Sequence, residues 1–290
     1  MASTRTCEHC GYDFPASRDH CPHCAWPLLS PNVAAADDAD EVSALDTRYA
    51  AATSELKTRG AQAVGTALET ALQDSHCVCT RSVAEVHRLA SNDRQLYATF
   101  YQLVEAGVVV PEEGEWDRRR RPVDDALFPG YHDKIHFGAL TLDGRGVRSY
   151  GACALVLSEK MIAHRSTVFD ENSVLWMERQ GIRISQAHQL PRGFRASWNA
   201  RGRLGLAKLA DSLDATSTPD AFADLVLADG ATTRDDSFIE AHVYGPVSIR
   251  TVQRVRVLRS RAELTDVEFA QIAELKETLP GWGVTLEESP

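Results

Sequence analysis

Two closely spaced pairs of cysteines near the amino end place the strongest constraint on how this chain can fold. Cys7 and Cys10 form one Cys-x-x-Cys pair, Cys21 and Cys24 form the second, and ten residues separate the pairs. A loop of this length can close four thiolates around one tetrahedral ion such as Zn²⁺. The segment has too few large apolar side chains to form a core, so the sequence predicts that the metal supplies its folding free energy.

The first 30 residues resemble the zinc ribbons that many bacterial proteins carry as appended modules. The resemblance implies a closed structural site with four cysteine ligands, and the alternative is a redox or iron site. We place His9, His20 and His23 around the site or on the surface, because four thiolates already complete the shell. The next segment, 31–44, is rich in Ala and Asp and predicts a linker.

The composition is that of a soluble globular protein. The chain has 290 residues, a net charge of −10 and 43% hydrophobic residues. It has no apolar run of the roughly 18 residues that a bilayer requires, and its amino end lacks the apolar segment of a signal peptide. We therefore expect a cytoplasmic protein without a membrane partner. A negative net charge does not exclude a local surface rich in Lys and Arg.

The rest of the chain predicts an α+β fold with flanking helices. Apolar residues recur with helical spacing over 45–107, and Ser82 and Thr265 each begin a capping pattern. The region 108–290 predicts the α+β domain with a mixed or antiparallel sheet. Its apolar runs, separated by Gly and Pro, predict strands at 108–110, 134–142, 150–157, 166–169, 238–243 and 252–258.

Polar residues inside one apolar strand give the clearest functional signal. In the run 238–246, alternation places Glu240 and His242 on one face, opposite Ile239, Ala241 and Val243. A carboxylate and an imidazole that point the same way are suited to acid–base chemistry. The alternative is that both residues lie on the solvent face of an edge strand. We expect a partly enclosed site, because Gly245 and Pro246 end the strand directly afterwards.

Two further groups of polar residues accompany apolar strands. Tyr150 precedes one strand, and Arg165, Ser166 and Thr167 follow it with a guanidinium and two hydroxyls that are suited to an anion or a cofactor. The second group, His132, Lys134 and His136, is expected on one strand face. A single histidine is more often structural than catalytic, so ligand contact is the less common outcome for each.

Taken in order, these strings resemble a bacterial family of unknown function. The matching segments are 128–140, 150–152, 165–173 and 239–246, and similar strings occur in toxin-like domains of phage-head and polymorphic-toxin proteins. The sequence departs from that pattern at Tyr244, where the family has His, and at Asn172, where it has Asp. The resemblance spans about residues 120–260 and excludes the zinc ribbon.

The resemblance implies a toxin-like or effector-like enzyme that acts on NAD or on nucleic acid, with three hypotheses. In an ADP-ribosyltransferase, a split sheet would hold NAD as substrate, Arg165 or Ser166 would orient it, and Glu240 would stabilise the oxocarbenium-like centre. In a metal-independent ribonuclease, Glu240 would work with His242 or His136, and Arg165 would stabilise the phosphorane. In an adaptor, the ribbon would bind a partner and the rest would be scaffold.

The remaining arginines and cysteines have simpler interpretations. Arg254 and Arg256 share one face of the strand 252–258, which predicts an exposed basic stripe beside the Glu240 strand and a second surface, besides the ribbon, for a protein or nucleic-acid partner. The run 118–121 consists of four arginines between acidic residues and predicts a solvated loop. Free buried thiols are expected at Cys77, Cys79 and Cys153.

Overall fold

A computed structural model describes residues 4–7, 10–15, 18, 20–24, 28–107, 115–182, 190–230 and 234–288, and gives only the backbone of residues 5 and 115–118. The strand expected at 108–110 lies outside these ranges. Within them, no helix combines the length and the apolar character that crossing a bilayer would require.

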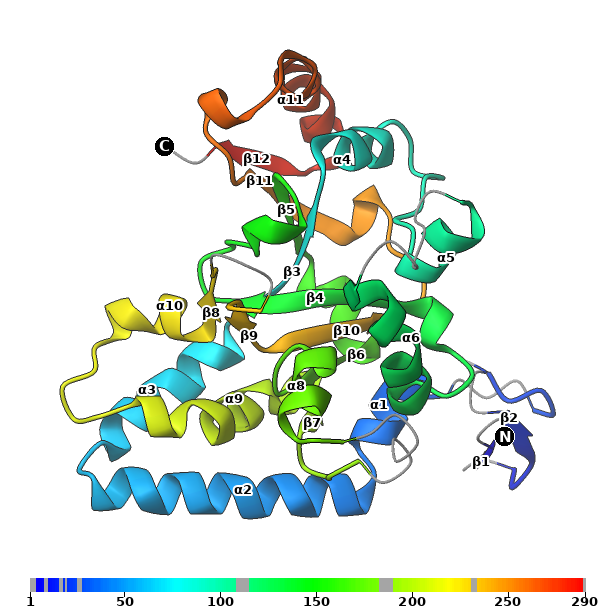
Figure 1. Cartoon of the computed structure of the whole chain (residues 1–290). Coiled ribbons are helices and arrows are strands. Elements are labelled where there is room, and N and C mark those ends of the chain that lie inside the picture. Colours follow the sequence, from blue (N-terminus) through cyan, green and yellow to red (C-terminus); the bar gives the residue numbers. More distant parts are fainter. Residues whose placement is uncertain are drawn as a thin grey trace.

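Helices and strands alternate along the described chain (Figure 1). The helices are α1 (Pro31–Ala36), α2 (Ala39–Thr58), α3 (Gln62–Gln73), α4 (Val83–Ala90), α5 (Phe100–Glu105), α6 (Glu115–Leu127), α7 (Glu159–Ile162), α8 (Ser173–Arg179), α9 (Arg201–Leu209), α10 (Phe222–Val226) and α11 (Asp266–Thr278). The strands are β1 (Thr4–Thr6), β2 (Asp13–Pro15), β3 (His76–Arg81), β4 (Ile135–Thr141), β5 (Cys153–Leu157), β6 (Ser166–Phe169), β7 (Arg195–Ser197), β8 (Leu227–Ala228), β9 (Ser237–Phe238), β10 (Glu240–Tyr244), β11 (Val252–Val257) and β12 (Thr285–Glu288).

The main sheet of the described chain contains eight strands in the order β12-β11-β5-β3-β4-β10-β6-β7. Neighbouring strands are antiparallel, except that β11 and β12 run parallel. Two short pairs, β1 with β2 and β8 with β9, form separate ladders. The predicted α+β class, with a mixed sheet and flanking helices, is confirmed.

The main sheet divides between β3 and β4. Three residue pairs join these strands, from His76 opposite Thr141 to Val78 opposite Ala139. Beyond Val78, strand β3 pairs with β5, whereas residues 135–138 of β4 pair with β10. Figure 1 shows β3 rising away from β4 and β10, so that two half-sheets diverge from this junction. We refer to the junction as the fork.

Gly138 makes the close approach of the two strands at the fork possible. A Cβ atom at this position would lie 2.6 Å from the backbone oxygen of Val78 and 3.1 and 3.2 Å from the sulfur atoms of Cys77 and Cys79. Because the first contact is with backbone, a side chain could fit only if the strands moved apart. The two thiols, together with Cys153, are free and buried, as predicted.

Helices cover the half-sheets on separate sides. Figure 1 shows α2, α3 and α9 below the half that contains β4 and β10, and α4 and α11 beside the half that contains β11 and β12. Within each group the helices pack on one another. One continuous apolar core links both groups through residues such as Leu72, Leu155 and Ile239. The expected capping boxes are present, Ser82 with Glu85 before α4 and Thr265 with Glu268 before α11.

Several local expectations were wrong. The segment 31–44 forms α1 and the start of α2, because Pro31 occupies the first turn and Val33 and Ala36 find a core to pack against. Strand β3 lies inside the region 45–107 that was expected to be helical. His132 and Lys134 lie in a 3₁₀ turn before β4 and do not share a strand face with His136.

Strand β11 is not next to the Glu240 strand. Strands β5, β3 and β4 separate it from β10. Arg254 donates a hydrogen bond of 3.2 Å to Glu287, and Arg256 donates one of 2.9 Å to the backbone oxygen of Asp143. Both side chains are half-buried, so the described structure does not present them as an exposed basic stripe beside the site.

Asn32 in α1 should matter for stability, because it ties this helix to β10 and to the turn before β6. Its amide nitrogen donates to the backbone oxygens of Arg165 at 3.1 Å and His242 at 3.2 Å, and the side chain is buried. Asn32→Ala leaves these acceptors without that donor and should lower the free energy of unfolding by about 1–3 kcal/mol. Chemical denaturation measures the change. Asn92→Ala, at an exposed position, should change it by less than about 0.5 kcal/mol, and equal effects at both positions would contradict the assignment.

Candidate functional site

The four cysteines of the amino-terminal segment form a candidate metal centre. Their sulfur atoms all lie within 4.8 Å of one another. Cys7 and Cys24 are 3.8 Å apart at sulfur, and Cys10 and Cys21 are 3.6 Å apart. Zn–S bonds of about 2.3 Å in a tetrahedron require sulfur separations of about 3.8 Å, so the donor set fits zinc. The structure supports the predicted set of metal ligands.

The local backbone favours a thiolate at Cys21. Burial raises the pKa of Cys21, but backbone N–H groups of Cys24 and His23 outweigh this effect and lower the pKa to about 6. The N–H of His23 lies 3.4 Å from the Cys21 sulfur. The ring of His23 stacks on Tyr12 with 5.3 Å between the ring centres, and the four-cysteine cluster does not include this residue. His9 lies outside the described residues.

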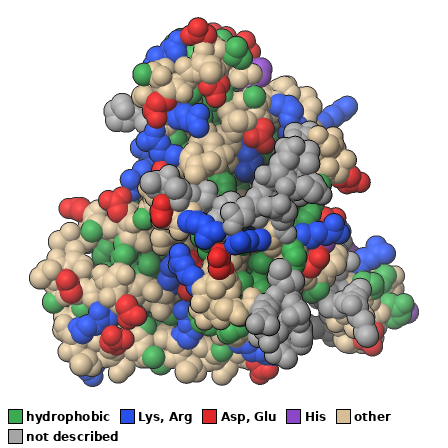
Figure 2. Space-filling model, in the orientation of Figure 1, with side chains coloured by type: hydrophobic (Ala, Val, Ile, Leu, Met, Phe, Trp, Pro, Cys, Tyr) green, Lys and Arg blue, Asp and Glu red, His purple; other side chains and the backbone are tan. Residues whose placement is uncertain are grey.

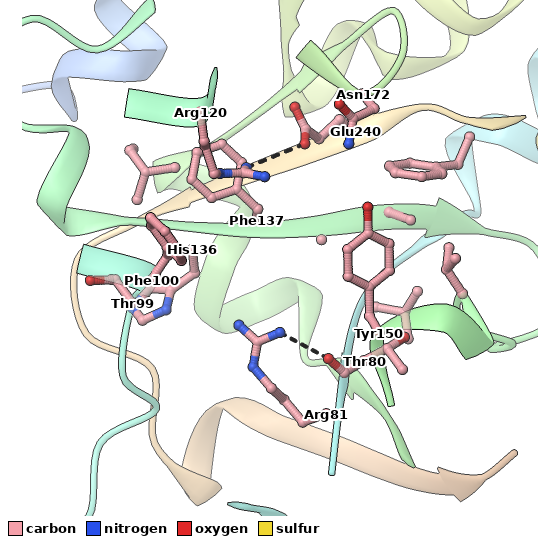
Figure 3. Close-up of a pocket in the computed structure, with 16 residues that line it drawn as sticks. Thr80, Arg81, Thr99, Phe100, Arg120, His136, Phe137, Tyr150, Asn172 and Glu240 are labelled. Atoms are coloured by element: carbon pink, nitrogen blue, oxygen red, sulfur yellow. Dashed lines mark hydrogen bonds and ion pairs between the residues drawn. The ribbon is translucent and has the colours of Figure 1, made fainter. Parts of the chain in front are cut away.

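A second candidate site is a cavity at the fork. It has a volume of about 190 Å³ and draws residues from β3, β4 and β10, together with α5, α6 and the turn before β5. Its polar and aromatic lining residues are Thr80, Arg81, Thr99, Phe100, Arg120, His136, Phe137, Tyr150, Asn172 and Glu240 (Figure 3). Figure 2 shows several Lys and Arg side chains gathered in the middle of the visible face, between the upper and lower parts of the molecule.

Glu240 and His242 lie side by side within β10, on the face predicted by alternation. The carboxylate of Glu240 lies 3.0 Å from Nε2 of His242, and the two residues are 1% and 2% exposed. Strand β10 pairs with both β4 and β6, so the edge-strand alternative is wrong. Glu240 lines the cavity, whereas His242 is not among its lining residues. The ring of His242 packs against Phe128 and Phe137.

Three neighbouring groups hold the pKa of Glu240 down. Burial raises its pKa, but the hydrogen bond and charge of His242, the charge of Arg120 and the backbone N–H of Ser173 at 3.1 Å together lower it below the usual range. An ionised carboxylate in an enclosed site can stabilise developing positive charge far better than one in water.

Arg120 is the principal residue of the cavity that the sequence analysis missed. The arginine run was expected in a solvated loop but lies in α6, where Arg120 stacks on Phe137 with 3.7 Å between the guanidinium and the ring centre. Its Nε atom donates to Asp124 at 3.2 Å, and its Nη2 atom lies 3.6 Å from Glu240. The spacing of four residues between Arg120 and Asp124 was the available signal for a helical ion pair.

His136 and Tyr150 also line the cavity. Burial and the positive charges of Arg81 and Arg165 lower the pKa of His136 to about 3, so its ring is neutral at physiological pH, and its Nδ1 atom has no hydrogen-bond partner. Burial raises the pKa of Tyr150 to about 12, so its hydroxyl keeps its proton. In Figure 3 this hydroxyl points toward Asn172 and Glu240.

Three other residues of the sequence analysis lie outside the lining of the cavity. Arg165 donates to the backbone oxygens of Met161 and Tyr244. Ser166 donates to the backbone oxygen of Ile162 at 2.8 Å, and the Thr167 hydroxyl lies 3.4 Å from the amide nitrogen of Asn32. These contacts hold β6 against its neighbours. The structure therefore brings together Glu240, His136 and Tyr150, and leaves Arg165, Ser166 and Thr167 apart from them.

Comparison with known proteins found neither a matching family model nor a matching curated protein. The resemblance to toxin-like domains therefore receives no support from these comparisons. The observations that remain for the function are the cysteine cluster and the fork.

We expect one zinc ion per chain. Elemental analysis of the purified protein should give a zinc-to-protein ratio near one. The double variant Cys7→Ser with Cys21→Ser should bind no zinc, because two of the four thiolate ligands are lost. Cys77→Ser together with Cys79→Ser is the matched control and should retain the zinc. A ratio of two, or a folded metal-free ribbon, would contradict the assignment.

His136 should make the protein sensitive to acid. Its pKa in the folded state, about 3, lies below the usual 6.5, so the unfolded chain binds more protons between these values and stability falls as pH drops from 6.5 toward 3. Removing this group with His136→Gln should make the fall less steep by up to about 1.4 kcal/mol per pH unit. Denaturation at pH 7, 6, 5 and 4 measures the slope. His164→Gln, at an exposed position, should leave it unchanged, and an identical slope in wild type and His136→Gln would refute the buried neutral imidazole.

Proposed function

We propose that this protein is an ADP-ribosyltransferase-like enzyme that uses NAD as its substrate, with Glu240 as the catalytic carboxylate. The observation that carries the proposal is a buried, ionised carboxylate in a cavity at the fork of a split sheet. In the reaction, the bond between ribose C1 and the nicotinamide nitrogen breaks, and its electron pair leaves with nicotinamide. The nucleophile of the acceptor then bonds to C1 and releases its proton. Glu240 stabilises the positive charge that develops on the ribose between these events.

The lining of the cavity supports a nucleotide ligand. Phe100 and Tyr150 offer aromatic surface for planar rings, and Arg81 offers positive charge for phosphates. The edge of residues 135–138 that faces away from β10 is not paired with the backbone of β3. The Phe137 oxygen accepts a hydrogen bond of 3.5 Å from the Cys79 thiol, and a planar amide such as that of nicotinamide would pair with the other backbone groups. The volume of about 190 Å³ suits one end of a dinucleotide, with the rest at the mouth beside Tyr150, which is 40% exposed.

His136 and Tyr150 would position the substrate in place of Arg165 and Ser166. The neutral His136 ring has a free Nδ1 atom, and burial keeps the Tyr150 hydroxyl protonated beside Glu240. A neutral imidazole acceptor and a phenol donor are suited to the hydroxyl groups of a sugar. Neither group carries a charge that would oppose the cationic centre.

The ribonuclease hypothesis has less support from the same geometry. General acid–base cleavage of RNA requires two proton-transfer groups on opposite sides of the reacting phosphate. The low pKa of His136, about 3, leaves it without a proton to donate near neutral pH, and His242 lies behind Glu240 on the same strand. Under this proposal the zinc ribbon selects a target or partner, and the closed four-thiolate shell takes no part in the chemistry.

Substitution of Glu240 tests the proposal directly. Purified protein is incubated with labelled NAD, in parallel with labelled RNA, and free nicotinamide and labelled protein are measured. Glu240→Gln keeps the shape and hydrogen bonds of the side chain but removes its charge, so NAD turnover should fall by about 10² or more while thermal stability changes little.

Glu277→Gln, at an exposed position in α11, is the matched control and should retain full turnover. Cleavage of RNA without consumption of NAD would replace the proposal with the ribonuclease hypothesis. Undiminished activity of Glu240→Gln would remove this site, and the adaptor hypothesis would then stand.

A further inference from the structure

The fork brings two buried thiols of β3 together at the point where the sheet divides. Cys77 and Cys79 are two residues apart in the strand, so alternation places both side chains on the same face. A Cβ atom at Gly138 in the facing strand β4 would lie 3.1 Å from the first sulfur atom and 3.2 Å from the second. The two sulfur atoms therefore lie side by side next to Gly138, where the pairing of β3 with β4 ends.

The two thiols differ in how readily they lose a proton. A hydrogen bond from the Cys77 side chain lowers the pKa of Cys79, burial raises it, and the charge of Arg81 lowers it, so that the resulting pKa lies below the usual value. The hydrogen bond with Cys79 and burial raise the pKa of Cys77 well above its usual value. Cys79 is thus the thiol that deprotonates first, with a protonated thiol beside it. The thiolate is the form that reacts with peroxides.

The fork cavity offers a small oxidant a route to this pair. Val78, Thr80 and Gly138, which adjoin the thiols, line the cavity, whereas Cys77 and Cys79 themselves are at most 1% exposed. Hydrogen peroxide is little larger than water, which occupies about 30 Å³ in the liquid, and the cavity has a volume of about 190 Å³. Peroxide can therefore reach Gly138, and local opening of the short ladder between β3 and β4 would expose the sulfur atoms to it.

A disulfide between these two cysteines would strain the strand. Cα atoms two residues apart in an extended strand are separated by about 6.6–6.8 Å, which is the upper end of the range of about 4.4–6.8 Å found in disulfides. Closing the bridge would therefore shorten β3 around Val78. Val78 with Ala139 is the last of the three residue pairs that join β3 to β4. A strained disulfide is also readily reduced, as a reversible modification requires.

We propose that Cys77 and Cys79 are a site of reversible oxidation by hydrogen peroxide, and that the disulfide they form distorts the closed end of the fork. The Cys79 thiolate attacks one oxygen atom of peroxide, the O–O bond breaks and hydroxide leaves, so that Cys79 becomes a sulfenic acid. The Cys77 sulfur then attacks the Cys79 sulfur, the S–O bond breaks, and the hydroxyl group leaves as water with the Cys77 proton. Peroxide takes up the two electrons that the thiols lose.

Oxidation at this position would reversibly alter the candidate active site, because the fork also forms the cavity that Glu240 lines. The inference does not depend on the proposed function, since it rests on the thiols and the strand pairing and requires no turnover of NAD.

Peptide mapping of the full-length, zinc-loaded protein tests the oxidation. The protein is treated with hydrogen peroxide, the remaining thiols are alkylated under denaturing conditions, and the tryptic peptides are analysed by mass spectrometry. Peptide 60–81 contains Cys77 and Cys79 and no other cysteine. The bridge should appear in this peptide as the loss of two hydrogen atoms without alkylation, and dithiothreitol should reverse the loss.

Cys153 in β5 is the internal control. It is as deeply buried as the pair, and burial raises its pKa to about 12. Peptide 60–81 should be oxidised about tenfold faster or more than peptide 149–160, which contains Cys153, because the rate follows the thiolate fraction. This comparison is made within wild type, so the folding of a variant cannot obscure it.

Single variants identify the sulfur atom that attacks peroxide. In Cys77→Ser the serine hydroxyl keeps a donor beside Cys79, and dimedone should trap the Cys79 sulfenic acid. In Cys79→Ser, Cys77 should stay reduced. The oxidation site would be overturned if peptide 60–81 kept both thiols, if Cys153 were oxidised equally fast, or if peptide 60–81 became linked to peptide 149–160.

Hydrogen–deuterium exchange tests the distortion of the fork. Backbone amides of β3 and of residues 138–141 should exchange about fivefold faster in the oxidised protein, the factor that corresponds to the net loss of one hydrogen bond. Amides of α11 should exchange equally fast in both forms, and reduction should restore the original rates in the fork. Unchanged exchange at the fork in a protein with the bridge formed would refute the distortion.

Discussion

The short ladder between β3 and β4 is the constraint on which the candidate active site depends. Only three residue pairs join the strands, and Gly138 lets their backbones approach where any side chain would meet the backbone oxygen of Val78. Beyond this point each strand pairs with a different neighbour, so the sheet opens and the outer edge of residues 135–138 faces a cavity. An unbroken sheet would have filled this space with paired backbone, and Glu240 would face a solid core. The split of the sheet therefore creates both the cavity that encloses Glu240 and the opening through which a ligand would reach it.

Inside the fork, a balance of burial and hydrogen bonding determines what the polar residues can do. Glu240 is taken almost completely out of water, yet His242, Arg120 and the backbone of Ser173 keep its pKa low. His136 is buried as deeply but lies near positive charge, so its pKa moves in the direction that removes its own charge. The same burial thus keeps one group charged and the other neutral. That contrast is what favours stabilisation of a cation over proton shuttling in the proposed chemistry.

The amino-terminal segment differs from the rest of the chain in the amount of apolar surface that it buries. Its buried residues form a small cluster around the cysteines, and β1 and β2 pair only with one another in the described structure. A segment of this size cannot bury enough apolar surface to offset its conformational entropy, and a metal ion held by the four cysteines would supply the missing stability. The α+β body relies on a continuous apolar core that extends through both half-sheets. Helix α1 begins at Pro31, and its Val33 and Ala36 are buried.

The features that depend on local spacing can be predicted from the amino-acid sequence. The cysteine spacing predicted a cluster that could hold a metal ion, the capping residues predicted the starts of α4 and α11, and alternation placed Glu240 and His242 on one face of a strand. The order of the strands in the sheet could not be predicted in this way, because pairing between segments far apart in the chain leaves no periodic signal in the sequence. The tertiary structure put β11 far from β10, turned an expected linker into α1, and brought Arg120 from a polar helix to the carboxylate. Alternation within one strand predicts which of its side chains are buried. The fork depends on how two strands pair and then diverge, which no single segment of the sequence encodes.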